Sequence, residues 1–289
     1  MCQSIRYADA SSRTQIRDMW KIVFEDPDNY MDLYFSRKYR DEYTLAYFLD
    51  KKPVSSLQMI PYAFTFCETE IPVAYIAGVC TLPEYRKKGY MDLLIKQALK
   101  ELAQKKVPLA ILVPQEDWLL NFYNQYGFEL TFDAGTENLP SIEELISRNS
   151  MDLEAAYKVF DEKFRNWDMT VQKTFEDFSV IVDESALFGY PLKKNLRGMS
   201  RVIDAEQLLQ LFVDFHPEKA FNIGVVDELL PKNNAGFMCH MGCVEKNPSH
   251  SDKFTEVDIK LLAQLLLGYH TSELDSHFRL TFPEKKPQI

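Results

Sequence analysis

The chain lacks the excess of basic residues on which nucleic-acid binding depends. Its 289 residues hold 33 Lys and Arg against 43 Asp and Glu, so the formal net charge is −10. A phosphate backbone is bound through a basic face, and we therefore expect no nucleic-acid partner. The same acidic balance suits a cationic small substrate, although it is also ordinary for soluble proteins.

Cysteine is scarce, and long apolar runs are missing. The five cysteines are an odd number at scattered positions, which argues against a secreted disulfide framework. The start, MCQSIRYADA, has neither the basic nor the apolar region of a signal peptide. The longest apolar run, LLAQLLLGY, is too short to span a bilayer. These features predict a cytoplasmic protein without a membrane partner.

What is present is a composition that is 46% hydrophobic, which predicts a well-packed core. Alternating and helical periodicities over the first 133 residues predict the order β-α-α-β-β-β-α-β-α-β. Residues 136–195 carry mainly helical patterns, and strand patterns return at Met199. We predict an α+β fold class with segments 1–135, 136–195 and 196–289.

A basic turn stands out in the stretch LPEYRKKGYMDLLIKQAL. Arg86, Lys87 and Lys88 precede Gly89, and a periodic helix is predicted from about Met91. Backbone amides at a helix start, next to fixed cations, form an anion site. The pattern therefore indicates a phosphate-bearing ligand. The alternative is an ordinary basic loop that caps a surface helix.

The stretch TLPEYRKKGYM resembles motif A of the GNAT acyltransferases, whose pattern is V-x-P-x-x-R/Q-x-x-G-x-G/A. Further along, NFYNQYGF at residues 121–128 is similar to the family's motif B, F-Y-x-x-x-G-F. Two motifs in this order are more specific than either alone. The chain departs from motif A at Met91, where the family prefers Gly or Ala.

The resemblance covers roughly residues 1–133 and implies a mixed, mostly antiparallel sheet with flanking helices. It also implies acetyl-CoA as a co-substrate and no metal. Amides and cations of the turn would hold the pyrophosphate, and amides of the preceding strand would face the thioester. The implied cofactor-binding residues are Val79, Cys80, Thr81, Arg86, Lys87, Lys88, Gly89, Tyr90 and Met91.

The resemblance also implies catalytic roles. Tyr123 matches the motif B tyrosine that serves as general acid toward the CoA sulfur, and Tyr126 is a weaker competitor. Cys80 raises the question of an acyl-enzyme. Because no histidine precedes His216, no Cys–His pair is suggested nearby. We therefore interpret Cys80 as a small strand residue beside the cofactor.

The stretches MSRVIDAEQLLQLF, VVDELLPKNNAGF and FTEVDIKLLAQLLLGY together resemble the sterol-carrier-protein-like domain of Eis-type acetyltransferases. The resemblance implies a GNAT domain at 1–135, a shortened, mainly helical middle segment at 136–195 and a sterol-carrier-protein-like domain at 196–289. The shortened middle leaves the family's hexamer in doubt, so the existence of a homo-oligomer stays open.

Eis proteins place their C-terminal carboxylate in the active site. By this resemblance Ile289 is a second catalytic residue, and the alternative is a frayed tail. The stretch CHMGC, with Cys239 and Cys243, invites a metal site. If it forms one strand, Cys239, Met241 and Cys243 face one way and His240 the other, which cannot enclose a zinc ion.

Our first hypothesis is an acetyl-CoA-dependent N-acetyltransferase that acts on a primary amine of a small-molecule acceptor. The acidic balance favours a cationic acceptor, such as an aminoglycoside, a polyamine or a lysine-like molecule. Two alternatives stay open, a non-catalytic acyl-CoA-binding or sensing protein and a lipid carrier acting through the C-terminal domain.

Overall fold

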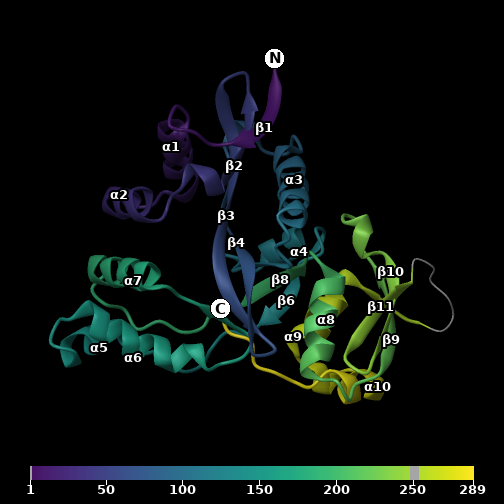
Figure 1. Ribbon diagram of the computed structural model, residues 1–289. Helices are drawn as coiled ribbons and strands as arrows, with labels where there is room; N and C mark the ends of the chain where they lie inside the picture. The colour runs from purple at the N-terminus through teal and green to yellow at the C-terminus, as the bar shows by residue number, and fades with distance from the viewer. Residues whose placement is uncertain (1, 248–253) are drawn as a thin grey trace.

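A computed structural model describes residues 2–247 and 254–289, and its centre is a long, twisted sheet (Figure 1). Strands in this sheet follow the order β1-β2-β3-β4-β5-β8-β6, with β7 added to β3. The order of elements predicted over the first 133 residues is confirmed. The strands are β1 (Gln3–Tyr7), β2 (Thr44–Leu49), β3 (Lys52–Phe66), β4 (Thr69–Thr81), β5 (Leu109–Leu112), β6 (Glu129–Phe132), β7 (Thr170–Gln172) and β8 (Gly198–Val202).

Helices cover both faces of the upper part of this sheet, α1 and α2 on one side and α3 on the other (Figure 1). Ile16, Met19 and Trp20 recur at helical spacing on α1, and all three are buried, as their periodicity predicts. Leu94 and Ala98 of α3 are buried in a separate core on the opposite face. The helices are α1 (Arg13–Phe24), α2 (Asp28–Arg37), α3 (Tyr90–Gln104) and α4 (Trp118–Asn124).

Strand β8 lies in a place that the sequence did not predict. We expected its residues to open the C-terminal domain, yet β8 fills the space between β5 and β6 and runs antiparallel to both. Every residue of β5 and of β8 is buried, so each strand needs a partner along both edges. The first sheet is therefore completed by chain from beyond residue 196.

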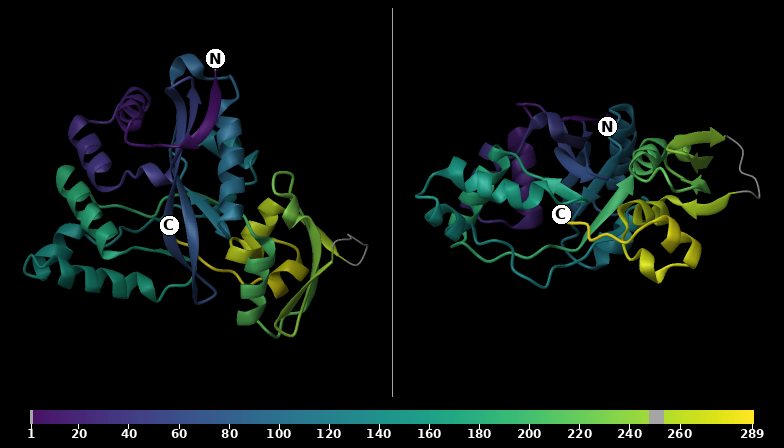
Figure 2. Two further views of the ribbon diagram at one scale, coloured as in Figure 1. Left: turned by 45° about the horizontal axis from the view of Figure 1, so that its top comes forward. Right: turned by 60° about the horizontal axis from the view of Figure 1, so that its bottom comes forward.

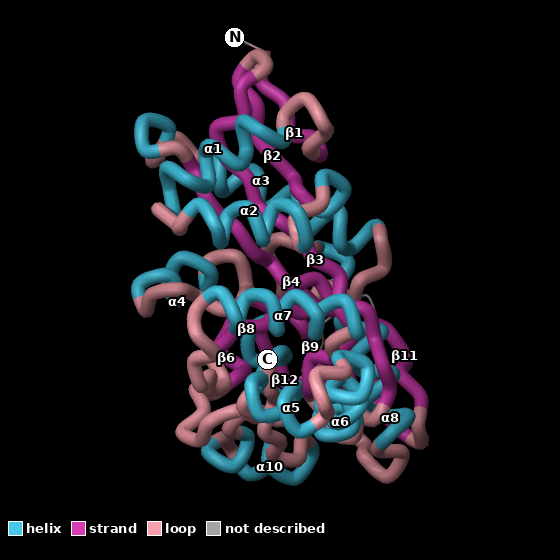
Figure 3. Tube along the Cα trace, turned by 90° about the vertical axis from the view of Figure 1, so that its left-hand side faces the viewer, coloured by secondary structure: helices cyan, strands magenta, loops and turns pink. Residues whose placement is uncertain are grey.

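The middle segment is mainly helical, as predicted, and lies below α1 and α2 on the same side of the molecule (Figure 3). Arg37 of α2 donates a hydrogen bond of 2.6 Å to Asp183 of α7, which ties this segment to the first domain. Strand β7 joins the first sheet beside β3. The helices are α5 (Ile142–Arg148), α6 (Leu153–Arg165) and α7 (Phe175–Leu187).

The last part of the chain forms a second sheet of four strands in the order β11-β10-β9-β12. Leu208 and Leu262 of its helices share one hydrophobic core with Phe64 and Phe132 of the first sheet. The two sheets are thus joined by a common interior (Figure 2). The elements are α8 (Ala205–Phe215), β9 (Phe221–Val226), β10 (Ala235–His240), β11 (Cys243–Asn247), β12 (Thr255–Asp258), α9 (Ile259–Leu267) and α10 (Ser276–Thr281).

The stretch CHMGC is not one strand. Met241 and Gly242 both have positive φ angles, 50° and 74°, and form the turn between β10 and β11, so His240 is paired with Cys243. Glycine tolerates this backbone conformation, which ends the strand early. Our expectation that Cys239 and Cys243 face one way along a single strand was therefore wrong.

Four short 3-10 turns complete the described secondary structure: Asp41–Tyr43, Pro83–Tyr85, Pro231–Asn233 and Thr271–Glu273. Over the described ranges, no helix combines the length and apolarity that crossing a bilayer requires. All five cysteines lie in those ranges and carry free thiols.

Candidate active site

The basic turn joins the end of β4 to the start of α3. Gly89 caps the helix with φ of 79°, and Lys87 also has a positive φ of 61°. The side chains of Arg86, Lys87 and Lys88 are exposed, and none is ion-paired with a carboxylate of residues 2–247 or 254–289. Unpaired cations at the positive end of a 15-residue helix form a site for an anion.

Four predicted cofactor residues lie around this turn in defined contacts. The Arg86 Nε donates a hydrogen bond of 3.2 Å to the Thr81 carbonyl, which fixes the turn to the end of β4. The Tyr90 ring stacks on Tyr47, with ring centroids 4.6 Å apart. Met91, the departure from motif A, packs against the core beneath α3, so an apolar side chain has a place there.

Strand β4 bulges just before the turn. Gln58 of β3 is paired with Ala77, whereas Ser56 is paired with Cys80, so Gly78 and Val79 both lie opposite one residue of β3. Gly78 has φ of 56°, and a Cβ there would lie 1.9 Å from the Trp20 ring. Only glycine fits, and the bulge turns the backbone of Val79 away from the regular ladder.

The bulge lies where β4 and β5 part. Their parallel pairing ends at Tyr75 and Ile111, while β4 continues to Thr81. Within the described ranges no strand pairs with this last part of β4 on the β5 side. Its backbone groups are therefore available to a ligand that enters between the two strands.

Tyr123, the predicted general acid, lies on α4 and is 6% exposed. Phe122 and Phe128 pack edge-on against its ring at centroid distances of 5.1 and 6.0 Å. Burial, with smaller contributions from Tyr75 and Tyr126, raises the pKa of Tyr123 well above its ordinary value. Its hydroxyl has no hydrogen-bond partner in the described part of the chain. A protonated, unengaged hydroxyl suits a proton donor.

Tyr126 and Cys80 are the other residues considered for a catalytic role, and their surroundings suit that role less well than those of Tyr123. Burial and the Asp92 carboxylate raise the pKa of Tyr126. Burial raises the pKa of the Cys80 thiol to about 12, and its sulfur lies 3.4 Å from the Ser56 hydroxyl. A thiol held neutral in this way is a poor nucleophile, which agrees with our interpretation of Cys80 as a strand residue.

A cavity of about 460 Å³, which we call the aromatic pocket, lies against the bulge. Gly78 and Gln115 line its side toward the gap between β4 and β5, and α1, α2, α7, β3 and β4, with the residues that flank these helices, supply the remaining wall. No pattern in the sequence predicted this pocket, because its residues come from elements far apart in the chain. They are Trp20, Phe24, Asp26, Tyr30, Tyr34, Lys38, Ile60, Tyr62, Tyr75, Ala77, Gly78, Gln115, Glu184 and Phe188.

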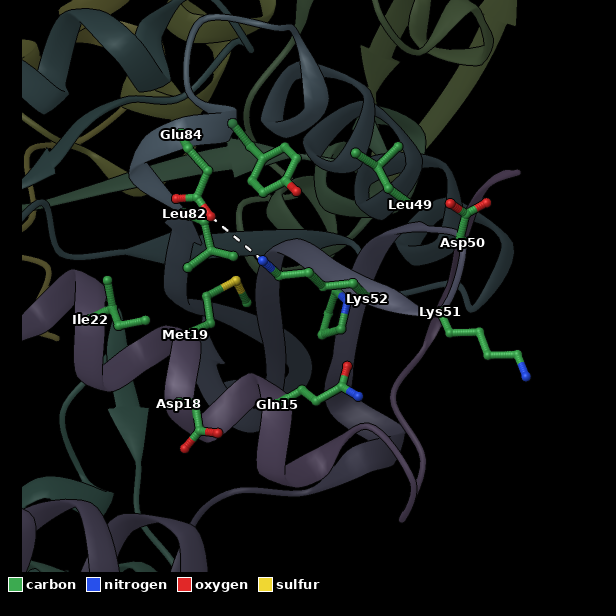
Figure 4. A pocket seen from close by; sticks show the side chains of 12 residues that line it. Gln15, Asp18, Met19, Ile22, Leu49, Asp50, Lys51, Lys52, Leu82 and Glu84 are labelled. Atoms are coloured by element: carbon green, nitrogen blue, oxygen red, sulfur yellow. Dashed lines mark ion pairs between the residues drawn. The ribbon is translucent and has the colours of Figure 1, made fainter. Parts of the chain in front are cut away.

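A second, open groove of about 670 Å³ lies between α1, the β2–β3 turn and the start of the basic turn (Figure 4). Lys52 crosses it and pairs with Glu84 at 3.5 Å. Because its lining charges include both signs and Lys52 is already paired, we assign this groove no ligand.

The chain end is docked against the body of the molecule, beside β7 and β8 (Figure 1). Gln288 donates to the Met169 carbonyl at 2.8 Å and accepts from the Val171 amide at 3.2 Å. The Ile289 side chain packs beside Gly198, with its Cγ2 atom 3.3 Å from the position of a Cβ there. The frayed tail that we kept as an alternative is therefore not what the structure has. Whether the carboxylate takes part in catalysis stays a prediction.

No group of three or more His, Cys, Asp or Glu side chains gathers as a metal site within residues 2–247 and 254–289. Cys239 is buried in the common core, and Cys243 is exposed on β11.

Comparison with known proteins agrees with this geometry. Residues 4–131 match the acetyltransferase (GNAT) domain family, while no curated protein matches the sequence. A conserved protein of unknown function from Enterococcus faecalis, described as a probable N-acyltransferase, has a TM-score of 0.72 at 16% identity and covers 100% of this chain and 99% of its own.

Two other solved structures also extend over almost the whole chain. A GCN5-related N-acetyltransferase from Anabaena variabilis has a TM-score of 0.66 at 15% identity, covering 99% of this chain and 98% of its own. Eis1 from Mycobacterium abscessus has a TM-score of 0.65 at 13% identity, with the same coverage. At such identities the likeness shows a shared fold in both halves of the chain.

Proposed function

We propose that the chain acetylates a primary amine bound in the aromatic pocket. The premise is that residues 4–131 form a GNAT acetyltransferase domain and that the chain is an acyltransferase with acetyl-CoA as co-substrate. The observation that carries this proposal is the position of Gly78. It lines the pocket and also begins the bulge where β4 and β5 part. An amine in the pocket and a thioester between the strands would meet there.

In this proposal the basic turn, the end of β4 and Tyr123 each have a defined task. Residues 86–91 bind the pyrophosphate through backbone amides and cations. Amides near Val79, Cys80 and Thr81 support the oxyanion that forms on the thioester carbon. Tyr123 protonates the departing CoA thiolate, because burial keeps its hydroxyl protonated at neutral pH.

A cationic acceptor suits the acidic side chains of the aromatic pocket. Asp26 lines it beside the rings of Trp20, Tyr30 and Tyr34, and Glu184, which is paired with Lys193, lines it as well. Ammonium groups are attracted both to carboxylates and to the faces of aromatic rings. An aminoglycoside, a polyamine and a lysine-like molecule all carry such groups.

We also propose that the chain is of the Eis type, with a sterol-carrier-protein-like C-terminal domain from residue 196 and a shortened middle segment at 136–195. The neighbour from Mycobacterium abscessus supports this subtype at the level of the fold. A cytoplasmic location stays a prediction from the scattered cysteines.

The direct test is an amine panel with acetyl-CoA, monitored by release of free thiol. Transfer to at least one primary amine is the expected result. Binding of acetyl-CoA without release of thiol in the presence of any amine would instead favour the non-catalytic acyl-CoA sensor.

Replacing Gly89 with valine should abolish binding of acetyl-CoA while the protein stays folded. No atom lies within 4 Å of a Cβ at this position, so the fold has room for the side chain. The φ of 79° is unfavourable for a β-branched residue, and the turn would have to change where the pyrophosphate binds. Calorimetric titration with acetyl-CoA measures the effect. Affinity equal to that of the parent would remove this turn from the binding site.

Adding one glycine after Ile289 should lower kcat by about 10- to 100-fold, because a carboxylate displaced by one residue no longer lies where the acceptor amine needs it. Amidation of the Ile289 carboxyl group should have a similar effect, whereas Ile289→Val should keep activity. Steady-state rates on the best amine of the panel decide the matter. Unchanged rates in the extended and amidated proteins would leave the tail with a structural role.

A further inference from the structure

The aromatic pocket has an acidic end and a basic end, placed at the two ends of α2. Asp26 lies two residues before the first residue of this helix, and Lys38 is its C-cap. A helix of 10 residues is about 15 Å long. The two charges therefore lie far enough apart to contact opposite ends of one small molecule.

Two lysines contact Tyr62 at the basic end: Lys38 lines the pocket, whereas Lys173, the residue after β7, is not among the lining residues. The Lys38 Nζ donates a hydrogen bond of 3.1 Å to the Tyr62 hydroxyl. The Lys173 Nζ lies 4.3 Å from the centroid of the same ring. Neither ammonium forms an ion pair with a carboxylate in the part of the chain that the structure describes.

The nearby carboxylates are largely engaged elsewhere. Asp177 accepts hydrogen bonds from the backbone and side chain of Thr174, at 2.9 and 2.7 Å. Glu184 is paired with Lys193 at 2.8 Å. The chain's own carboxylate at Ile289 forms no ion pair with Lys38 or Lys173. Asp177 acts on Tyr62 and Lys173 without forming an ion pair with either lysine, and Lys193 neutralises Glu184, so the basic end has two ammonium groups against one nearby carboxylate.

Such an arrangement is unfavourable until an anion arrives. Burial, and after it the Lys38 ammonium, lower the pKa of Lys173 to about 8, while Asp177 opposes the shift. A carboxylate between the two ammonium groups would offset both the desolvation and the repulsion. It would also gain charge-assisted hydrogen bonds from Lys38 and Lys173.

We propose that the acceptor is an extended amino carboxylate, whose carboxylate binds Lys38 and Lys173 while its amine lies at Gly78. The inference rests on the proposed function and selects among its acceptor classes. A lysine-like molecule or a short peptide with a free carboxyl end has both groups, whereas a polyamine and an aminoglycoside have amines alone.

The length of the pocket fits this class. Gln58 is paired with Ala77, next to Gly78, and Tyr62 lies further along β3, about 13 Å away at the rise of a strand. The long side chains of Lys38 and Lys173 shorten the span that a ligand must cover. A flexible chain of several methylene groups between amine and carboxylate is therefore required, which excludes short α-amino acids that react at their α-amine.

The test compares three ligands of matched length, ε-aminocaproate, its amide ε-aminocaproamide, and hexamethylenediamine. Dissociation constants are measured by calorimetry in the presence of CoA, and kcat/KM is measured with acetyl-CoA. The carboxylate should bind about 10- to 100-fold more tightly than its amide, since a hydrogen-bonded charge is lost in the amide. In the double variant with Lys38→Met and Lys173→Met, the affinities for the acid and the amide should become equal. The control variant Lys246→Met, in the C-terminal sheet, should keep the parent's preference for the acid.

Each other outcome is decisive. If the parent protein binds the acid and the amide with equal affinity, or prefers the diamine, the inference is wrong. The proposed function still holds in that case, provided that acetyl is transferred to any of the amines. A preference that persists in the double variant assigns the carboxylate to other residues and also overturns the inference. Loss of kcat on all three acceptors alike, without a change in preference, also overturns the inference, because the lysines would then not recognise the acceptor's carboxylate. If no amine is acetylated, the proposed function fails. The ratio of the dissociation constants of the acid and the amide still tests whether the basic end binds a carboxylate.

Discussion

Replacing Tyr123 with phenylalanine is expected to lower kcat by about 10² to 10⁴, the usual contribution of general acid catalysis. The substitution keeps the ring that packs against Phe122 and Phe128 and removes only the hydroxyl. Because this hydroxyl has no hydrogen-bond partner among the described residues, its loss should change stability little. Single-turnover release of CoA thiol measures the chemical step directly.

Tyr126→Phe is the matched control, since Tyr126 is also buried and also has a raised pKa. It should leave kcat within a few-fold of the parent value, and affinity for acetyl-CoA should be unchanged in both variants. The raised pKa of Tyr123 has a further consequence for pH dependence. Since the proton is retained well into the alkaline range, loss of the Tyr123 proton should not lower the rate up to about pH 10, its ordinary pKa. Full turnover in Tyr123→Phe would transfer the role to Tyr126 or to water.

Replacing Asp227 with alanine is expected to lower the free energy of unfolding by about 3–5 kcal/mol, because it leaves a buried guanidinium without its counter-charge. Arg201 of β8 is fully buried, and its Nη2 donates to the Asp227 Oδ1 at 2.7 Å. The same oxygen accepts from the Leu229 and Leu230 amides at 3.0 and 3.1 Å. Urea unfolding of the parent and variant measures the difference.

Two further variants separate the buried charge from the other contacts. Arg201→Met combined with Asp227→Leu removes both charges and should recover part of the loss, since a buried pair can often be exchanged for apolar side chains. Glu206→Ala breaks an exposed pair with Lys246 and should change stability by less than about 1 kcal/mol. A loss of under about 1 kcal/mol in Asp227→Ala would show that the guanidinium is not dependent on Asp227.

The Arg201–Asp227 pair also supports the candidate active site. The Arg201 Nε donates to the Tyr126 carbonyl at 2.8 Å, just beyond the helix that carries Tyr123. A Cβ on Gly127 would lie 2.6 Å from the same Nε, so the glycine of motif B makes room for the arginine. The second half of the chain thus supports the helix that bears the predicted general acid.

The sequence by itself determined the local elements of the first domain and the basic turn. Its short strands and amphipathic helices follow from side-chain periodicity, which depends on neighbours a few residues apart. The spacing of Pro83, Arg86 and Gly89 before a helix predicted the turn, and the structure places Gly89 at the helix cap with a positive φ. Motif B likewise located Tyr123 on a short helix, of which it is the buried residue.

Only the tertiary structure decided what lies beside these elements. It placed β8 in the first sheet, docked the chain end against β7, and built the aromatic pocket from α1, α2, α7, β3 and β4. None of these contacts has a periodic signature, because they join segments far apart in the chain, such as β5 and β8, or depend on a single glycine such as Gly78. Pairing across that distance is selected by burial of the whole chain, and for this reason the charges at the two ends of the pocket were not visible in the sequence.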